Sequence, residues 1–275
     1  MKIYSWNVLN PNINISYKTW SKFNNKTLAK RIAQADFVRF SLFRKQAIIN
    51  TLKHWLKTDK VIICLQEVNN ELLTDIKNIK NVVVNNTTLL NDNCQTTIVK
   101  GYNVVASELI LNINNKDKRV MKTTLNNNCE IYNVHLHWTW NSDDISIAGR
   151  IIEDSLKTQY FVVCGDMNKT YETIEPFMNE FDCLEMQKGL KGYTGINTET
   201  GNLDIIDHIF LSTSLDNHSD IKIISKVNNF HILYNFDKIF KLFKYKKYSV
   251  NEWIENRINK DISDHKPIMI KIRLI

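Results

Sequence analysis

Short apolar runs that end in polar residues recur along the whole chain, and this pattern constrains the fold more than any other feature of the sequence. Each run has the length and the content of Val, Ile, Phe and Tyr that are typical of a β-strand. The runs are KIYSWN (2–7), VIICLQE (61–67), EIYNVHLHW (130–138), YFVVCGDMN (160–168), LDIIDHIFL (203–211) and SDHKPIMIKI (263–272). Helix-like segments lie between several of them, and this alternation predicts a layered α/β fold.

Three segments between these runs are expected to be helical. The first is capped by Ser41 and carries apolar residues at roughly helical spacing from Leu42 to Leu56. The second spans about 144–157 and the third about 171–184. The chain has only 7 Gly and 3 Pro and no stretch that resembles a linker. We therefore expect all 275 residues to form a single domain.

The composition is that of a soluble protein. Apolar residues make up 43% and charged residues 24%, close to the average for globular domains. No apolar run approaches the ~20 residues that cross a bilayer, and the first residues have neither signal-peptide nor transit-peptide character. The 5 cysteines include no CxxC pair, which favours reduced thiols over a zinc site. An intracellular, cytoplasmic protein without a membrane partner is expected.

The charge balance favours a polyanionic partner. Lys and Arg number 36 against 29 Asp and Glu, a formal charge of +7, although codon bias towards Lys could account for part of this excess. Two segments, near 11–40 and 229–260, interleave basic and aromatic residues. Such segments fit single-stranded nucleic acid, because cations follow the phosphates and aromatic faces stack on bases. Aromatic residues of the core beside solvated lysines are the alternative interpretation.

Polar side chains stand at the ends of the apolar runs. In layered α/β folds the carboxyl ends of strands converge on a crevice, where ligand sites are usually built. Carboxylate and amide oxygens suit Mg²⁺ or Mn²⁺, and these ions suit phosphoryl oxygens. The chain lacks a GxSxG elbow, a Walker A loop and a HExxH helix, which argues against serine hydrolases, P-loop NTPases and zinc proteases. The set comprises Asn7, Glu67, His135, Asp166, Asn168, Asp207, Asp264 and His265.

Six motifs carry a resemblance to a known family. In chain order SWNVLN, LQEV, NVHLHW, CGDMN, LDIIDHIF and SDHKPI resemble the ordered motifs of the endonuclease/exonuclease/phosphatase, or DNase I-like, superfamily. The resemblance runs through nearly the whole chain. It implies a four-layer α/β sandwich, in which two mixed β-sheets pack face to face with helices on the outside. It also implies Mg²⁺-dependent hydrolysis of phosphoesters, with Mn²⁺ as the alternative ion.

The same resemblance implies a metal site. Glu67 matches the family's LQE and would be the principal Mg²⁺ ligand. Asn7 matches the Asn of the first family strand and would bind or orient the metal, and Asp264 would lie beside it. A carboxylate left in water and a solvent-facing Asn are the simpler interpretations of Glu67 and Asn7.

Catalytic roles follow from the resemblance for five further residues. Asp166 would polarise the attacking water and Asn168 would hold that water or the phosphate, unless the Gly-Asp-x-Asn turn only caps a loop. His265 would donate hydrogen bonds to the phosphoryl oxygens, and Asp207 would orient its ring. His135 matches the histidine that contacts the scissile phosphate.

Weaker assignments concern residues near these motifs. His137 lies two residues after His135, hence on the same face of a strand, and is either a substrate contact or a core histidine. Arg119 and Arg150 match loosely placed family arginines that bind substrate, and a surface role is equally compatible. His208 follows Asp207 and should face the opposite side of its strand, where it would be structural.

The branch of the superfamily that the motifs resemble indicates which substrate to expect. Abasic-site endonucleases carry an acidic residue two positions after the first Asn, and here that residue is Leu9. The WNVL opening and the HLHW strand resemble the deadenylase and nocturnin-type branch. We therefore predict a deadenylase-like 3′ exonuclease on single-stranded RNA that needs no obligate protein partner. The alternatives are a DNA repair endonuclease or phosphodiesterase, a phosphatase on small or lipid phosphates, and a catalytically silent binding protein.

Overall fold

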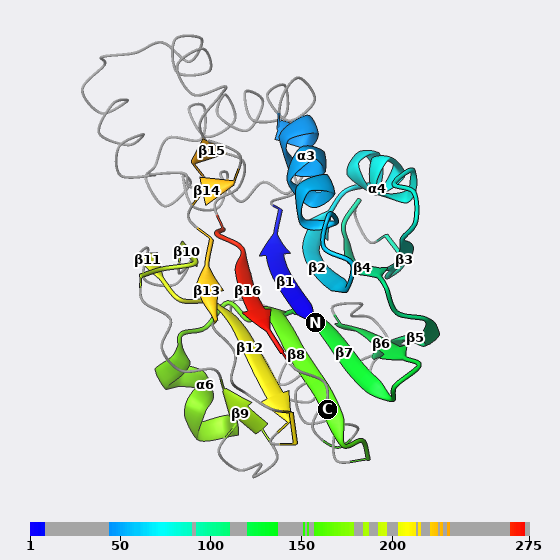
Figure 1. Ribbon diagram of the computed structural model, residues 1–275. Helices are drawn as coiled ribbons and strands as arrows, with labels where there is room; N and C mark the ends of the chain where they lie inside the picture. The colour runs from blue at the N-terminus through cyan, green and yellow to red at the C-terminus, as the bar shows by residue number, and fades with distance from the viewer. Residues whose placement is uncertain are drawn as a thin grey trace, which may run out of the picture.

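The computed structural model describes residues 1–8, 44–89, 92–110, 120–136, 151, 153, 157–178, 184–186, 192–196, 203–212, 214–215, 221–224, 226–227, 230–231 and 265–272 (Figure 1). The first basic and aromatic segment, 11–40, and nearly all of the second, 229–260, lie outside these ranges. The roles predicted for the two segments therefore stay predictions.

The described residues form two six-stranded mixed sheets. In the first, β1 and β2 run parallel and their neighbours antiparallel; in the second, β7 and β8 are the parallel pair. The first sheet has the order β13 (Lys222–Ile223), β16 (Ile268–Lys271), β1 (Lys2–Asn7), β2 (Val61–Val68), β4 (Cys94–Lys100) and β3 (Val83–Asn86). The second has the order β5 (Val104–Ile110), β6 (Val120–Leu125), β7 (Cys129–His135), β8 (Tyr160–Asp166), β12 (Asp207–Ser212) and β9 (Leu184–Met186).

Alternation along the strands divides their side chains between three apolar layers. Ile3 and Ile62 of the first sheet pack against Ile131 and Val162 of the second, between the two sheets. The opposite face of the first sheet packs on α3 (Lys45–Trp55) and α4 (Asn70–Lys77). The opposite face of the second packs on Ile174 of α6 (Tyr171–Met178). Two sheets between two helical layers confirm the predicted four-layer sandwich.

The first predicted helix is present as α3, and its predicted cap, Ser41, lies outside the described residues. Ile48, Leu52 and Trp55 of α3 are buried against the sheet. The Trp55 ring stacks on Tyr4 of β1 with centroids 4.3 Å apart. This contact fixes the helix over the strand that ends in Asn7.

Two of the expected boundaries need correction. The third predicted helix does not reach residue 184, because Leu184 begins β9 and pairs with Ser212 of β12. The run 203–211 is two strands, β11 (Leu203–Asp204) and β12, and β11 pairs with β10 (Gly195–Ile196). The predicted helix at 144–157 lies almost entirely outside the described residues. A further small pair joins β14 (Lys226–Val227) and β15 (Phe230–His231).

Helix α4 is an element that the sequence patterns did not indicate. The Asn69 side chain accepts a hydrogen bond of 3.0 Å from the Leu72 backbone N–H and so caps the helix.

Cys64, Cys94, Cys129 and Cys164 are buried free thiols. None of the helices in the described ranges has the length and apolar content to cross a membrane.

Candidate active site

A cluster of buried polar side chains lies where the inter-sheet apolar layer ends, at the carboxyl ends of β1, β7 and β8. In the second sheet, Asp166 of β8 pairs with His135 of β7 and with Asp207 of β12. Residues paired across neighbouring strands point to the same face. The register of three strands therefore places His135, Asp166 and Asp207 side by side, facing the first sheet.

Glu67 reaches this cluster through a β-bulge. By strict alternation from Gln66, which faces inward, Glu67 would point to the helical layer. The pairing of β2 with β4 shifts between Leu65 and Val68, and Glu67 has a φ of 58°. A positive φ is uncommon outside glycine, and bulges of this kind often re-aim a side chain next to a functional site. Here the bulge turns a buried carboxylate, 3% exposed, towards Asn7.

Asn7 joins the two carboxylates of this half of the cluster. Its Nδ2 donates to Glu67 Oε1 at 3.1 Å and to Asp166 Oδ2 at 2.9 Å. His135 Nε2 lies 3.6 Å from the same Glu67 oxygen and 3.8 Å from the same Asp166 oxygen. One carboxylate oxygen from each sheet thus converges on one amide and one imidazole.

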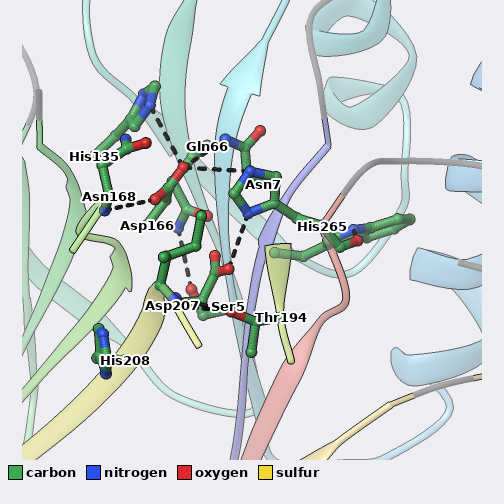
Figure 2. A network of polar contacts seen from close by, with 12 residues as sticks. Ser5, Asn7, Gln66, His135, Asp166, Asn168, Thr194, Asp207, His208 and His265 are labelled. Carbon is green, nitrogen blue, oxygen red and sulfur yellow. Dashed lines mark hydrogen bonds and ion pairs between the residues drawn. The ribbon is translucent and has the colours of Figure 1, made fainter. Parts of the chain in front are cut away.

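His265 and Asp207 form the other half. His265 Nδ1 lies 2.9 Å from Asp207 Oδ2, and the opposite ring nitrogen, Nε2, lies 3.6 Å from Asp166 Oδ2 (Figure 2). The Trp6 indole N–H donates to the His265 carbonyl at 3.0 Å and fixes its backbone. A carboxylate on Nδ1 holds the proton there, so the orientation of the ring towards Asp166 is set by Asp207.

Asn168 lies in a turn that follows β8 and has a φ of 55°. Its backbone N–H donates to Asp166 Oδ1 at 2.9 Å, and its side-chain Nδ2 donates to the Leu136 carbonyl at 2.9 Å. The Gly-Asp-x-Asn motif therefore does form a turn that is closed by an Asp166 side-chain contact. The Asn168 backbone holds one oxygen of Asp166, and the other oxygen faces Asn7 and His265.

The electrostatics of the cluster centre on Asp166. Burial raises the pKa of Asp166 to about 7; the charge of His265 opposes this shift, whereas Asp207 and Glu67 add to it. Three carboxylates gathered in a buried site repel one another. A cation in contact with them would relieve this repulsion.

The donors fit a hard divalent cation. Asp166, Asp207 and His265 can each offer one ligand atom, and these atoms lie within 4.8 Å of one another. Asp207 Oδ1 is buried and has no hydrogen-bond partner in the described part of the chain. Asp207 Oδ2 and His265 Nδ1 already bind each other, and Asn7 Nδ2 likewise donates to Glu67 Oε1. Glu67 and Asn7 as the residues that hold the cation therefore stay a prediction. Asp264, the third predicted ligand, lies outside the described ranges.

Of the four weaker assignments, only His208 lies among the described residues. His137, Arg119 and Arg150 lie outside the described residues, so their predicted substrate contacts stay predictions. His208 points away from the cluster, and its Nε2 lies 2.7 Å from the Lys169 carbonyl (Figure 2). Burial lowers the pKa of His208, which agrees with the structural role predicted for it.

Two supporting residues escaped the sequence analysis. Thr194 Oγ1 accepts hydrogen bonds from the backbone N–H groups of Ile206, at 2.9 Å, and Asp207, at 3.0 Å. A Cβ added to Gly195 would stand 3.0 Å from Cε1 and Nδ1 of the His265 ring. These residues precede β11 and carry no strand-like or motif signal, so only the fold reveals that they position Asp207 and His265.

A further pair supports the Glu67 bulge. Asn133 Nδ2, from the facing sheet, donates to the carbonyls of Leu65, at 3.1 Å, and Thr96, at 3.0 Å. Gln66 Nε2 donates to Asn133 Oδ1 at 2.8 Å. Asn133 therefore bonds the strands on both sides of the bulge. Strand alternation could have indicated Gln66 and Asn133 as inward polar residues, but not what they bind.

Replacing Thr194 by Val is expected to destabilise the protein by about 1–3 kcal/mol, because it leaves the buried N–H groups of Ile206 and Asp207 without their acceptor. The shape of the side chain is retained, so packing changes little. Denaturant unfolding measures the effect, and Thr194→Ser, which keeps the hydroxyl, is the matched control. Equal stability of the Val and Ser variants would contradict the positioning role.

Three solved structures share this fold over almost the whole chain. D. rerio TDP2 complexed with a single-strand DNA product is 13% identical, with 100% of this chain and 99% of that chain covered and a TM-score of 0.58. The human Nocturnin catalytic domain with bound sulfate is 12% identical, with 99% and 94% covered and a TM-score of 0.56. An endonuclease/exonuclease/phosphatase family protein from Leptotrichia buccalis is 15% identical, with 100% and 100% covered and a TM-score of 0.55.

No protein-family model and no curated protein matches the sequence. At the identities given above, a structural likeness shows the fold alone. The fold that the resemblance to the endonuclease/exonuclease/phosphatase superfamily implied is thereby confirmed.

Proposed function

We propose that this chain is a Mg²⁺-dependent phosphodiesterase that hydrolyses single-stranded nucleic acid. One observation carries the proposal: Glu67, Asp166 and His265, from distant parts of the chain, meet in one cluster at the end of the sandwich. Carboxylates beside imidazoles on this fold support phosphoester chemistry more than any other reaction.

Glu67 would hold the metal and Asn7 would orient the Glu67 carboxylate. Asp264 is the further candidate ligand, and Mn²⁺ is the alternative ion. When bound, the ion would neutralise charge on the phosphate and polarise its oxygens. Asn7 contacts Glu67 and Asp166 together, which supports its role in orienting the Glu67 carboxylate.

The remaining residues would act on the water and the phosphate. Asp166 would accept the proton of the attacking water at Oδ2, while the Asn168 backbone holds Oδ1. His265 would donate from Nε2 to a phosphoryl oxygen as negative charge develops, and Asp207 keeps the Nδ1 proton in place. His135 Nε2, on the other side of Asp166, would contact a second phosphoryl oxygen.

The substrate class rests on charge and on the structural neighbours. The net charge of +7 favours a polyanion. The D. rerio TDP2 structure contains single-stranded DNA product, and the Nocturnin domain binds a sulfate anion, which resembles a phosphate in shape and charge. RNA as the preferred strand stays the prediction from the WNVL and HLHW motifs.

A substrate panel tests the proposal. Labelled oligo(A), mixed RNA, single- and double-stranded DNA, an abasic duplex and inositol phosphates are incubated with the protein and Mg²⁺. Cleavage of single strands, with RNA preferred, is the expected result. Hydrolysis of inositol phosphates alone would overturn the assignment, and hydrolysis of the abasic duplex alone would favour a DNA repair enzyme.

Removal of divalent ions by EDTA is expected to abolish hydrolysis, and added Mg²⁺ or Mn²⁺ should restore it. Glu67→Gln should raise the Mg²⁺ concentration for half-maximal activity by at least about tenfold, because an amide replaces the carboxylate ligand. Glu71→Gln, on the exposed side of α4, is the control. Full activity in EDTA would contradict the metal site.

A further inference from the structure

A hollow lies at the opposite end of the sandwich from the acidic cluster. It is open, with a volume of about 730 Å³, and it is lined by the starts of β1 and β2, the end of β16 and the two connections that follow β4 and β6. The cluster lies at the other end of β1, so the length of that strand separates the two sites by about 20 Å. None of the residues that line this hollow has a role in the proposed hydrolysis.

The hollow is positively charged. Lys60 precedes β2 and Lys271 ends β16, and both line it. The Met1 ammonium donates to the Ile272 carbonyl at 2.8 Å beside them. Burial lowers the pKa of that ammonium, and the charges of Lys60 and Lys271 lower it further, so the positive charge of the hollow is carried mainly by the two lysines. No carboxylate is among the lining residues that the structure describes.

The remaining walls supply an aromatic ring and amide donors. The Lys60 Nζ lies 5.7 Å from the centroid of the Tyr102 ring. Asn127 Oδ1 accepts from the Cys129 N–H, which leaves the amide NH₂ of Asn127 as its unused end in the described structure. The Asn126 N–H donates to the Asn103 carbonyl at 2.9 Å and ties the β6–β7 turn to the connection after β4.

The geometry of the chain at Gly101 keeps these groups together. Gly101 has a φ of 78°, and a Cβ there would collide with the carbonyl oxygen of Asp59. The chain before Lys60 therefore lies directly against the chain before Tyr102. This close approach holds the lysine next to the ring, so the walls are formed before any ligand arrives.

We infer that this hollow binds a nucleotide, with its phosphate between Lys60 and Lys271 and its base against Tyr102. Ammonium groups and amide N–H donors bind phosphate oxygens. A base stacks on an aromatic face, and the volume is within the range of small-molecule sites. The nucleotide is either a free mononucleotide or one residue of a nucleic-acid strand. The inference does not depend on the proposed hydrolysis.

Isothermal titration calorimetry in EDTA tests the inference without metal or turnover. AMP, inorganic phosphate and oligo(A) are titrated into the wild type, into Lys60→Gln/Lys271→Gln, and into the control Lys53→Gln/Lys57→Gln, which changes two exposed lysines in α3 and in the turn that follows it. We expect AMP affinity to fall at least about tenfold in the first double variant only, since two charge-assisted contacts are lost. AMP should bind more tightly than phosphate.

The titration with oligo(A) distinguishes a free nucleotide from one residue of a nucleic-acid strand. A parallel loss of oligo(A) affinity in the Lys60→Gln/Lys271→Gln variant supports a strand segment, and an unchanged oligo(A) affinity supports a free nucleotide. Unchanged AMP affinity in that variant, equal affinity for AMP and phosphate, or no AMP binding by the wild type would overturn the inference. NMR shifts of the Asn126 and Asn127 side-chain amides on AMP addition give the same answer in the wild type and need no variant.

Discussion

Asp166→Asn is expected to lower hydrolysis by about 10²- to 10⁴-fold, the usual contribution of a general base, while the protein stays folded. The amide cannot accept the proton of the attacking water. It has the same shape as the carboxylate and retains an oxygen that can accept from Asn7 or Asn168. Single-turnover kinetics on the best substrate of the panel measure the loss.

The same substitution should leave thermal stability equal or higher. The Asp166 carboxylate is buried, and Asp207 and Glu67 add to the rise of its pKa to about 7. A neutral amide removes that repulsion. Asp75→Asn, whose surface ion pair with Lys45 is 3.2 Å long, is the control and should change neither activity nor stability much. A variant within tenfold of the wild-type rate would rule out Asp166 as the base.

Strand periodicity predicted most of the framework that carries this site. Asn7, His135 and Asp166 end β1, β7 and β8, and Asp207 begins β12; all four belong to the inter-sheet face that alternation along each strand defines. Inward polar residues at strand ends can therefore be identified from sequence. Which strands lie beside each other depends on long-range pairing, and only the family resemblance supplied it.

Glu67 shows why the geometry of the site was less predictable. Its place after VIICLQ indicated a strand-end carboxylate, but alternation alone would have turned it towards α3 and α4. The bulge that re-aims it, with a φ of 58°, depends on Asn133 of the other sheet, which bonds the carbonyls of Leu65 and Thr96. A local pattern contains no information on such a contact between sheets. The same holds for Thr194, whose partners follow β11.

The reductions in kcat caused by substituting His265 and by substituting Asp207 are expected not to be additive. We expect His265→Ala to lower kcat about 10³-fold, as for removal of one donor to a developing oxyanion. Asp207→Asn should lower it less, and the double variant should equal His265→Ala. Asp207 binds His265 Nδ1 at 2.9 Å, so a residue that acts only by positioning the ring has no effect once the ring is gone. His54→Ala, exposed on α3, is the control.

The Mg²⁺ dependence of these variants decides between two roles for Asp207. Its carboxylate could instead join Asp166 and His265 around a cation, because their ligand atoms lie within 4.8 Å. A positioning residue leaves the Mg²⁺ concentration for half-maximal activity unchanged, whereas loss of a ligand raises it. We expect no shift in Asp207→Asn, because Asp207 holds the His265 ring. We expect a clear shift in Glu67→Gln, because Glu67 is the ligand that the LQE motif predicts. A shift in Asp207→Asn comparable to that in Glu67→Gln would move the metal to the Asp166, Asp207 and His265 group.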